Sequence, residues 1–95
     1  MRMVIDRTQR IGLEAQCWLL TAFAELDRVA ALPSEEHQRI QAAIKERHPE
    51  GIARAFEAAE ESLGELRNVA RRLAQAVRFG QLPILRRLVF EIARA

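Results

Sequence analysis

The segment CWLLTAFAEL, residues 17 to 26, most constrains the fold of this chain, because it is almost wholly apolar yet lies within a charged sequence. Apolar residues recur around it at steps of three and four residues, which predicts a helix rather than a buried strand. The residues in this stripe are Ile11, Ala15, Trp18, Ala22, Leu26 and Val29. The pattern predicts a first helix from about Asp6 or Thr8 to Ala31.

The apolar surface of this helix is wider than one stripe. A second apolar line consists of Leu13, Cys17, Leu20 and Ala24, and a third of Leu19 and Phe23. A helix that is apolar on most sides must be covered on most sides. A chain of 95 residues buries only about 60 to 70% of its unfolded surface. We therefore expect Cys17 to be buried and another chain to cover part of the helix.

Proline and glycine divide the remaining sequence into three further helices. Pro33 and Ser34 open a short second helix that ends near Arg47, with Ser34 as its N-cap. Pro49 begins the third helix, since proline is favoured in the first helical turn, and His48 is then a cap or loop residue. Gly80 ends the third helix, and the fourth spans residues 84 to 95.

The third helix has the most regular pattern in the chain. Its apolar residues alternate steps of four and three over about four heptads, the spacing of helices packed at a shallow angle. They are Ile52, Phe56, Ala59, Leu63, Leu66, Ala70, Leu73 and Val77. Gly64 interrupts good helix formers, which indicates a bend or a close helix crossing there.

Together these segments predict an all-α fold made of one domain, residues 1–95. Two long helices form an elongated antiparallel hairpin, with two short helices beside it. We expect the chain to associate as a homodimer through the first helix, the fourth helix or both, because both carry surplus apolar surface.

Charge is distributed unevenly along the sequence. Residues 1 to 66 hold 8 Lys/Arg and 12 Asp/Glu, a net charge of −4, whereas residues 67 to 95 hold 7 Arg and one Glu, a net charge of +6. Such asymmetry indicates complementary pairing within a dimer, an acidic partner, or nucleic-acid contact. The arginines that would serve an acidic partner or phosphate groups are Arg71, Arg72, Arg78, Arg86 and Arg87.

The number of cysteines and the length of the apolar segments indicate where in the cell the protein is located. Cys17 is the only cysteine, so the chain has no disulfide framework, which is typical of a reducing, cytoplasmic setting. No segment reaches the ~18 uncharged apolar residues of a membrane span, and no secretory signal precedes the first helix. A soluble protein is expected.

The residues that catalysis or metal binding would need are few. Cys17, His37 and His48 include no nucleophile and base with an orienting third group, and no ligand pair one helical turn apart. The four glycines are isolated, so no phosphate-binding loop is present. We expect no enzyme activity, no cofactor and no metal.

Surplus helical apolar surface then favours protein binding. The interface predicted from the sequence comprises Trp18, Leu19, Leu20, Phe23, Leu85, Leu88, Val89, Phe90 and Ile92. In architecture the chain resembles small bacterial helical regulators, such as anti-activators that sequester a transcription factor, and chaperones that hold apolar segments. Two alternatives stay open: an accessory nucleic-acid-binding protein that uses the arginine-rich third, and a small helical enzyme with a site between subunits.

Overall fold

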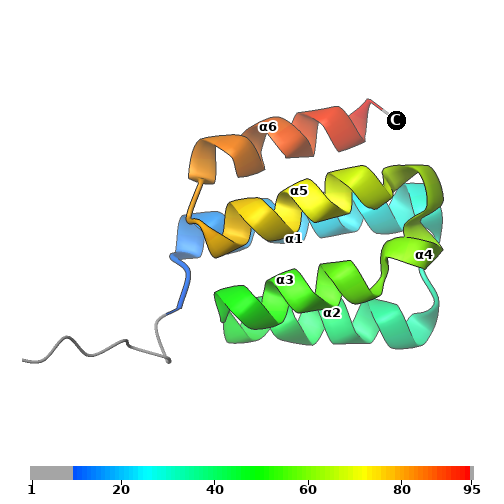
Figure 1. The fold of residues 1–95 in the computed structure, drawn as a ribbon, viewed down its shortest axis with the longest axis horizontal. Coiled ribbons are helices and arrows are strands. Elements are labelled where there is room, and N and C mark those ends of the chain that lie inside the picture. The colour runs from blue at the N-terminus through cyan, green and yellow to red at the C-terminus, as the bar shows by residue number, and fades with distance from the viewer. Residues whose placement is uncertain (1–9, 95) are drawn as a thin grey trace, which may run out of the picture.

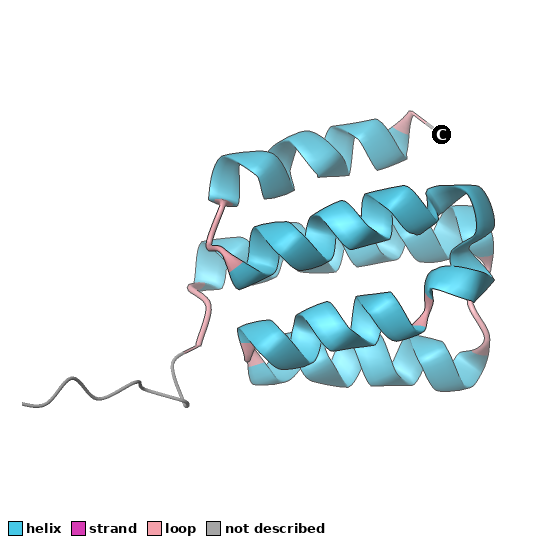
Figure 2. Ribbon diagram, viewed as in Figure 1, coloured by secondary structure: helices cyan, strands magenta, loops and turns pink. Residues whose placement is uncertain are grey.

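A computed structural model describes residues 10–94, and all its regular structure is helical (Figure 2). The predicted all-α class is therefore confirmed for this part of the chain. The elements are α1 (Leu13–Ala30), α2 (Ser34–Glu46), α3 (Pro49–Ala58), α4 (Glu60–Leu63), the 3-10 turn η1 (Gly64–Leu66), α5 (Arg67–Arg78) and α6 (Leu82–Ala93).

The five longer helices close into a ring. α1 packs on α2, α2 on α3, α3 on α5, α5 on α6, and α6 returns to pack on α1 (Figure 1). Successive helices run antiparallel, whereas α6 and α1, which close the ring, run in the same direction. The chain thus forms a bundle of five helices of 10 to 18 residues instead of the predicted elongated hairpin.

The prediction of one long third helix is wrong. The chain leaves the helix at Ala59 and folds back through α4 and η1, so α5 lies antiparallel against α3 (Figure 1). Gly64 has φ +58° and ψ −118°, a conformation that strongly favours glycine. The bend indicated by Gly64 is therefore confirmed, but it is a reversal of the chain.

The predicted helix ends need smaller corrections. Residues 10–12 are not helical, since the Ile11 N–H donates to the carbonyl of Arg47 at 2.8 Å; the predicted start at Asp6 or Thr8 lies outside the described residues. Ser34 is the first residue of α2 and makes no capping hydrogen bond, because Pro33 occupies the N-cap position. His48 does cap α3, where its Nδ1 accepts a hydrogen bond from the Gly51 N–H at 3.3 Å.

The closed ring of helices covers one side of α1 with residues of the same chain. Leu19, Ala22, Phe23 and Leu26 lie in one continuous core, and Leu19 and Phe23 are 0% and 4% exposed. α2 and α6 both pack against α1. The single chain therefore buries Leu19 and Phe23 by itself, and the expectation that another chain covers part of α1 can apply only to the residues that stay exposed. None of the helices described is long and apolar enough to cross a membrane.

Candidate protein-binding surface

An apolar line remains on the outer side of α1 after the ring has closed. Leu13 is 65% exposed, Leu20 is 38% exposed, and Cys17 and Ala24 are also exposed. These four residues follow steps of four, three and four along the helix, so they form one straight stripe. We call Leu13, Cys17, Leu20 and Ala24 the α1 stripe.

The stripe is exposed because the neighbouring helices hold α1 by its two sides. On the α2 side, the Gln16 side chain donates to the carbonyl of Ile44 at 3.1 Å, and Asp27 contacts His37 at 3.2 Å. On the α6 side, the rings of Trp18 and Phe90 lie 6.3 Å apart. The stripe lies between these contacts and faces away from the core.

The stripe itself presents little polarity. The Thr21 hydroxyl, beside it, donates to the carbonyl of Cys17 at 3.0 Å, so this polar group is satisfied within the helix. Glu14 and Arg28 border the stripe near the two ends of α1, and Arg28 forms an ion pair with Glu25 at 2.7 Å. The result is an apolar line with charges at its ends.

Phe90 adds an exposed aromatic side chain on α6, across the polar edge of α1 that carries Thr21 and Glu25. Its side chain is 59% exposed and touches the partly buried Trp18, which lies at the level of the middle of the stripe. An exposed aromatic ring beside an aliphatic stripe is the composition of a protein contact surface. The α1 stripe together with Trp18 and Phe90 is called the α1 face below.

The predicted interface residues divide between core and surface. Three of the nine, Trp18, Leu20 and Phe90, belong to the α1 face. The other six are buried in the core of the single chain: Leu19, Phe23, Leu85, Leu88, Val89 and Ile92. Leu13, Cys17 and Ala24 were not included, although their spacing with Leu20 was visible in the sequence, and the expectation that Cys17 is buried is wrong.

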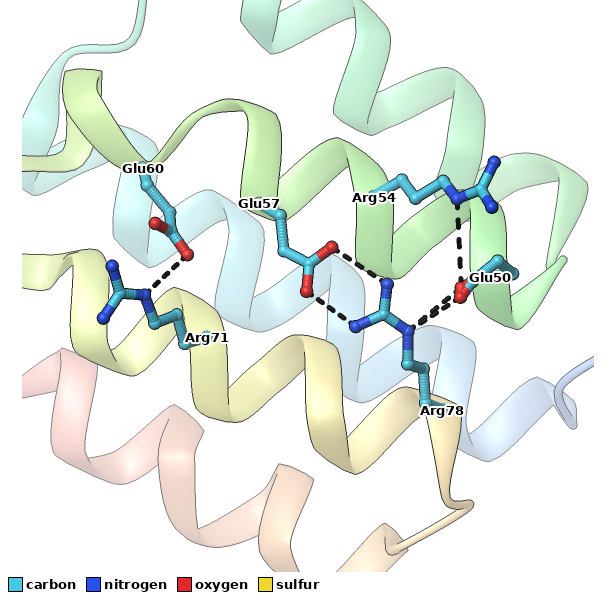
Figure 3. A network of polar contacts seen from close by, with 6 residues as sticks. All are labelled: Glu50, Arg54, Glu57, Glu60, Arg71 and Arg78. Atoms are coloured by element: carbon cyan, nitrogen blue, oxygen red, sulfur yellow. Dashed lines mark hydrogen bonds and ion pairs between the residues drawn. The ribbon is translucent and has the colours of Figure 1, made fainter.

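Arg78 links two helices within the chain. Its guanidinium contacts Glu50 at 2.7 Å and Glu57 at 2.6 Å, which joins the end of α5 to α3 (Figure 3). These hydrogen bonds lower the pKa of Glu50 and of Glu57 below the ordinary value and raise that of Arg78. Arg54 lies 4.0 Å from Glu50 at the edge of the same network. Arg78 is thus engaged within the chain.

Two more of the predicted arginines are paired. Arg71 contacts Glu60 at 2.8 Å (Figure 3), which raises the pKa of Arg71. Arg72 contacts Glu91 at 2.8 Å. Acids of α3 and α4, together with Glu91 of α6, therefore neutralise part of the arginine-rich third internally. Among residues 10–94, Arg86 and Arg87 have no ion pair with a carboxylate.

Two hollows lie away from the α1 face. A shallow one of about 260 Å³ between α5 and α6 is lined by Arg71, Arg72, Gln75, Gln81, Ile84 and Arg87. An apolar one of about 370 Å³ lies at the end of the ring and is lined by Ile11, Gly12, Glu14, Ala15, Ala76, Val77, Gly80, Leu82 and Leu85. Exposed Phe79, at the end of α5, directly precedes Gly80 of this second hollow.

Across residues 10–94, no three His, Cys, Asp or Glu side chains lie close enough together to hold a metal ion. Each histidine already has a structural contact, His37 with Asp27 and His48 with the backbone of Gly51. Comparison with protein-family models, with curated proteins and with solved structures finds no match to this chain.

Proposed function

We propose that the chain is a non-enzymatic, helical protein-binding regulator that sequesters a partner polypeptide on its α1 face. The observation that supports this function is the α1 stripe, which stays outside a core that five helices already complete. A regulator of the anti-activator or chaperone kind, with a transcription factor as one class of partner, fits this reading. The free, exposed thiol of Cys17 suits a reducing cytoplasm.

The geometry favours a helix as the bound segment. A partner helix with apolar residues at steps of three and four would lie along the α1 stripe and present its own stripe to it. Leu20 lies mid-stripe, and Phe90 offers an aromatic anchor at the same level, where contact residues contribute most to affinity. Glu14 and Arg28 at the stripe ends would orient the partner helix through charge.

A photoreactive maleimide on Cys17 tests this function, because the chain has no other cysteine. Irradiation with an extract of the cells that make the protein should give a discrete adduct. Unlabelled wild-type protein should suppress it, whereas unlabelled Leu20→Glu should not. The same probe on Asn68, an exposed residue of α5, in the variant Cys17→Ala/Asn68→Cys, is the matched control. Identical adducts from both positions would count against the α1 face.

The nucleic-acid alternative rests on Arg86 and Arg87, which no carboxylate of residues 10–94 neutralises. Phosphate contacts through these arginines would make DNA or RNA affinity fall steeply with salt. Fluorescence anisotropy of a labelled duplex, with the wild type and with Arg86→Gln/Arg87→Gln, distinguishes this activity from protein binding. The remaining alternative, an enzyme site between subunits, would require the homodimer expected from the sequence.

A further inference from the structure

The α1 stripe is complementary to itself. Its spacing of four, three and four reads the same in both directions, so a second α1 laid antiparallel on the first would meet apolar residues throughout. Leu13 would face Ala24 of the second copy, and Cys17 would face Leu20 of the second copy. The two-fold axis would then pass between Cys17 and Leu20, at the level of Trp18.

Charges beside the stripe are complementary to those of an antiparallel second copy. Glu14 and Arg28 lie two heptads apart and therefore on the same flank of α1. An antiparallel second copy brings its Arg28 to the flank that holds Glu14, and the lean of helical side chains toward the N-terminus shortens the remaining offset. A parallel copy would instead bring this flank against the opposite flank of α1, which holds Gln16 and Asp27, so the contact between Glu14 and Arg28 would not form. The antiparallel pair therefore gains the same contact between opposite charges at both of its ends.

The aromatic pair lies where this two-fold axis would pass. Phe90 touches Trp18, and α6 runs beside α1 in the same direction. The antiparallel rotation keeps α6 of both copies on the same side of the interface, so the two Phe90 rings would come close to the axis. Their contact would widen a face that a single helix stripe leaves narrow for a stable interface.

We infer that the occupant of the α1 face in the isolated protein is a second copy of this chain, packed antiparallel about an axis near Cys17 and Leu20. This inference rests on the proposed function, because it assigns the same face to self-association. Homodimer formation and partner binding are then mutually exclusive. The dimer keeps the stripe covered until a partner with greater affinity displaces one copy. The concentration of free partner therefore sets how much of the protein is homodimer and how much is bound to the partner.

Light scattering behind a sizing column, over a hundredfold dilution, tests for the dimer. Wild-type protein should have twice the mass of one chain at high concentration, and Leu20→Glu should be a folded monomer, with helicity checked by circular dichroism. Phe79→Glu is the matched control, because Phe79 is a 69% exposed apolar residue outside the α1 face, and this variant should stay dimeric. A wild-type monomer at every concentration overturns the inference.

Single-cysteine cross-linking tests the orientation. Antiparallel pairing separates the two copies of residue 17 by about 4.5 Å along the helix axis and the two copies of residue 13 by about 16 Å. A short bismaleimide should therefore link wild-type chains through Cys17. In a Cys17→Ala background, Leu13→Cys should link to Ala24→Cys of a mixed sample but not to itself. Self-linking of Leu13→Cys without the mixed product would overturn the antiparallel arrangement.

Failure of this inference can be told apart from failure of the proposed function. A monomeric wild type that still gives the Cys17-specific adduct in cell extract overturns self-association and keeps partner binding. A wild-type protein that cross-links as a dimer, but whose separately prepared Cys17 probe yields no adduct even at dilutions where the dimer dissociates, keeps the self-association and removes the support for a partner.

Discussion

At the residue scale, Arg78 contacts two carboxylates at once, and its role is structural. It holds Glu50 and Glu57 together across the α3 and α5 contact. Because these bonds lower the pKa of both carboxyl groups, the stabilisation is present above their ordinary pKa of 4.5 and is lost as the pH falls through the lowered folded-state values.

Arg78→Met should therefore reduce stability at neutral pH, where it leaves the Glu50 and Glu57 carboxylates near each other with only the more distant Arg54 as a cation, 4.0 Å from Glu50. The difference from wild type should shrink on acidification, since wild type loses the same contacts when both groups are protonated. Urea unfolding at neutral pH and below pH 4 measures this. Arg71→Met, which removes a single ion pair to Glu60, is the matched control and should have a smaller effect. A constant difference at all pH values would contradict the assignment.

Ala31 is a second informative residue, because it ends α1 with φ +52° and ψ +64°. A left-handed conformation costs a residue with a Cβ about 1–2 kcal/mol. Glycine does not have this cost, but its greater conformational freedom in the unfolded state lowers the free energy of unfolding by about 0.4–1 kcal/mol. Ala31→Gly should raise the free energy of unfolding by about 0.5–1 kcal/mol in urea titrations. Ala42→Gly, at an exposed interior position of α2, should instead lower it by about 1 kcal/mol.

At the element scale, the segment after Pro49 shows what a sequence pattern can and cannot predict. Seven of its eight seam residues are buried, and only Leu66 is partly exposed, so the heptad spacing predicted burial correctly. The same spacing continues through the turn at Ala59 and Gly64, because both helices present apolar residues to one core. Periodicity therefore cannot detect the reversal, which needs the backbone conformation of Gly64.

Gly64→Ala should be costly for this reason. A Cβ at Gly64 meets no atom within 4 Å, so the penalty comes from the backbone conformation alone, on the order of 1–3 kcal/mol. Gly12→Ala is the matched control, since Gly12 also has open space around it but a negative φ of −70°. Urea unfolding of both variants should show a loss only for Gly64→Ala. Equal stabilities would show that the turn tolerates an alternative path.

At the scale of the whole molecule, ring closure decides which apolar residues are core and which are surface. The sequence identifies α1 as apolar on most sides, but it gives no means of knowing that α2 and α6 would cover Leu19 and Phe23 and leave Leu13 and Cys17 outside. Six of the nine predicted interface residues therefore belong to the core of the single chain. Of the four residues in the α1 stripe, the predicted interface included only Leu20.

The adjacent pair Leu19 and Leu20 separates these two roles, because the residue type is the same and the exposure is 0% against 38%. Leu19→Ala should lower the free energy of unfolding by about 2–5 kcal/mol through loss of core packing. Leu20→Ala should change the free energy of unfolding of the monomer by less than about 0.5 kcal/mol and should weaken self-association instead. Urea unfolding at low protein concentration and sedimentation at high concentration measure the two effects. If Leu20→Ala destabilises the monomer as much as Leu19→Ala while association is unchanged, the stripe belongs to the core of the fold and is no binding surface.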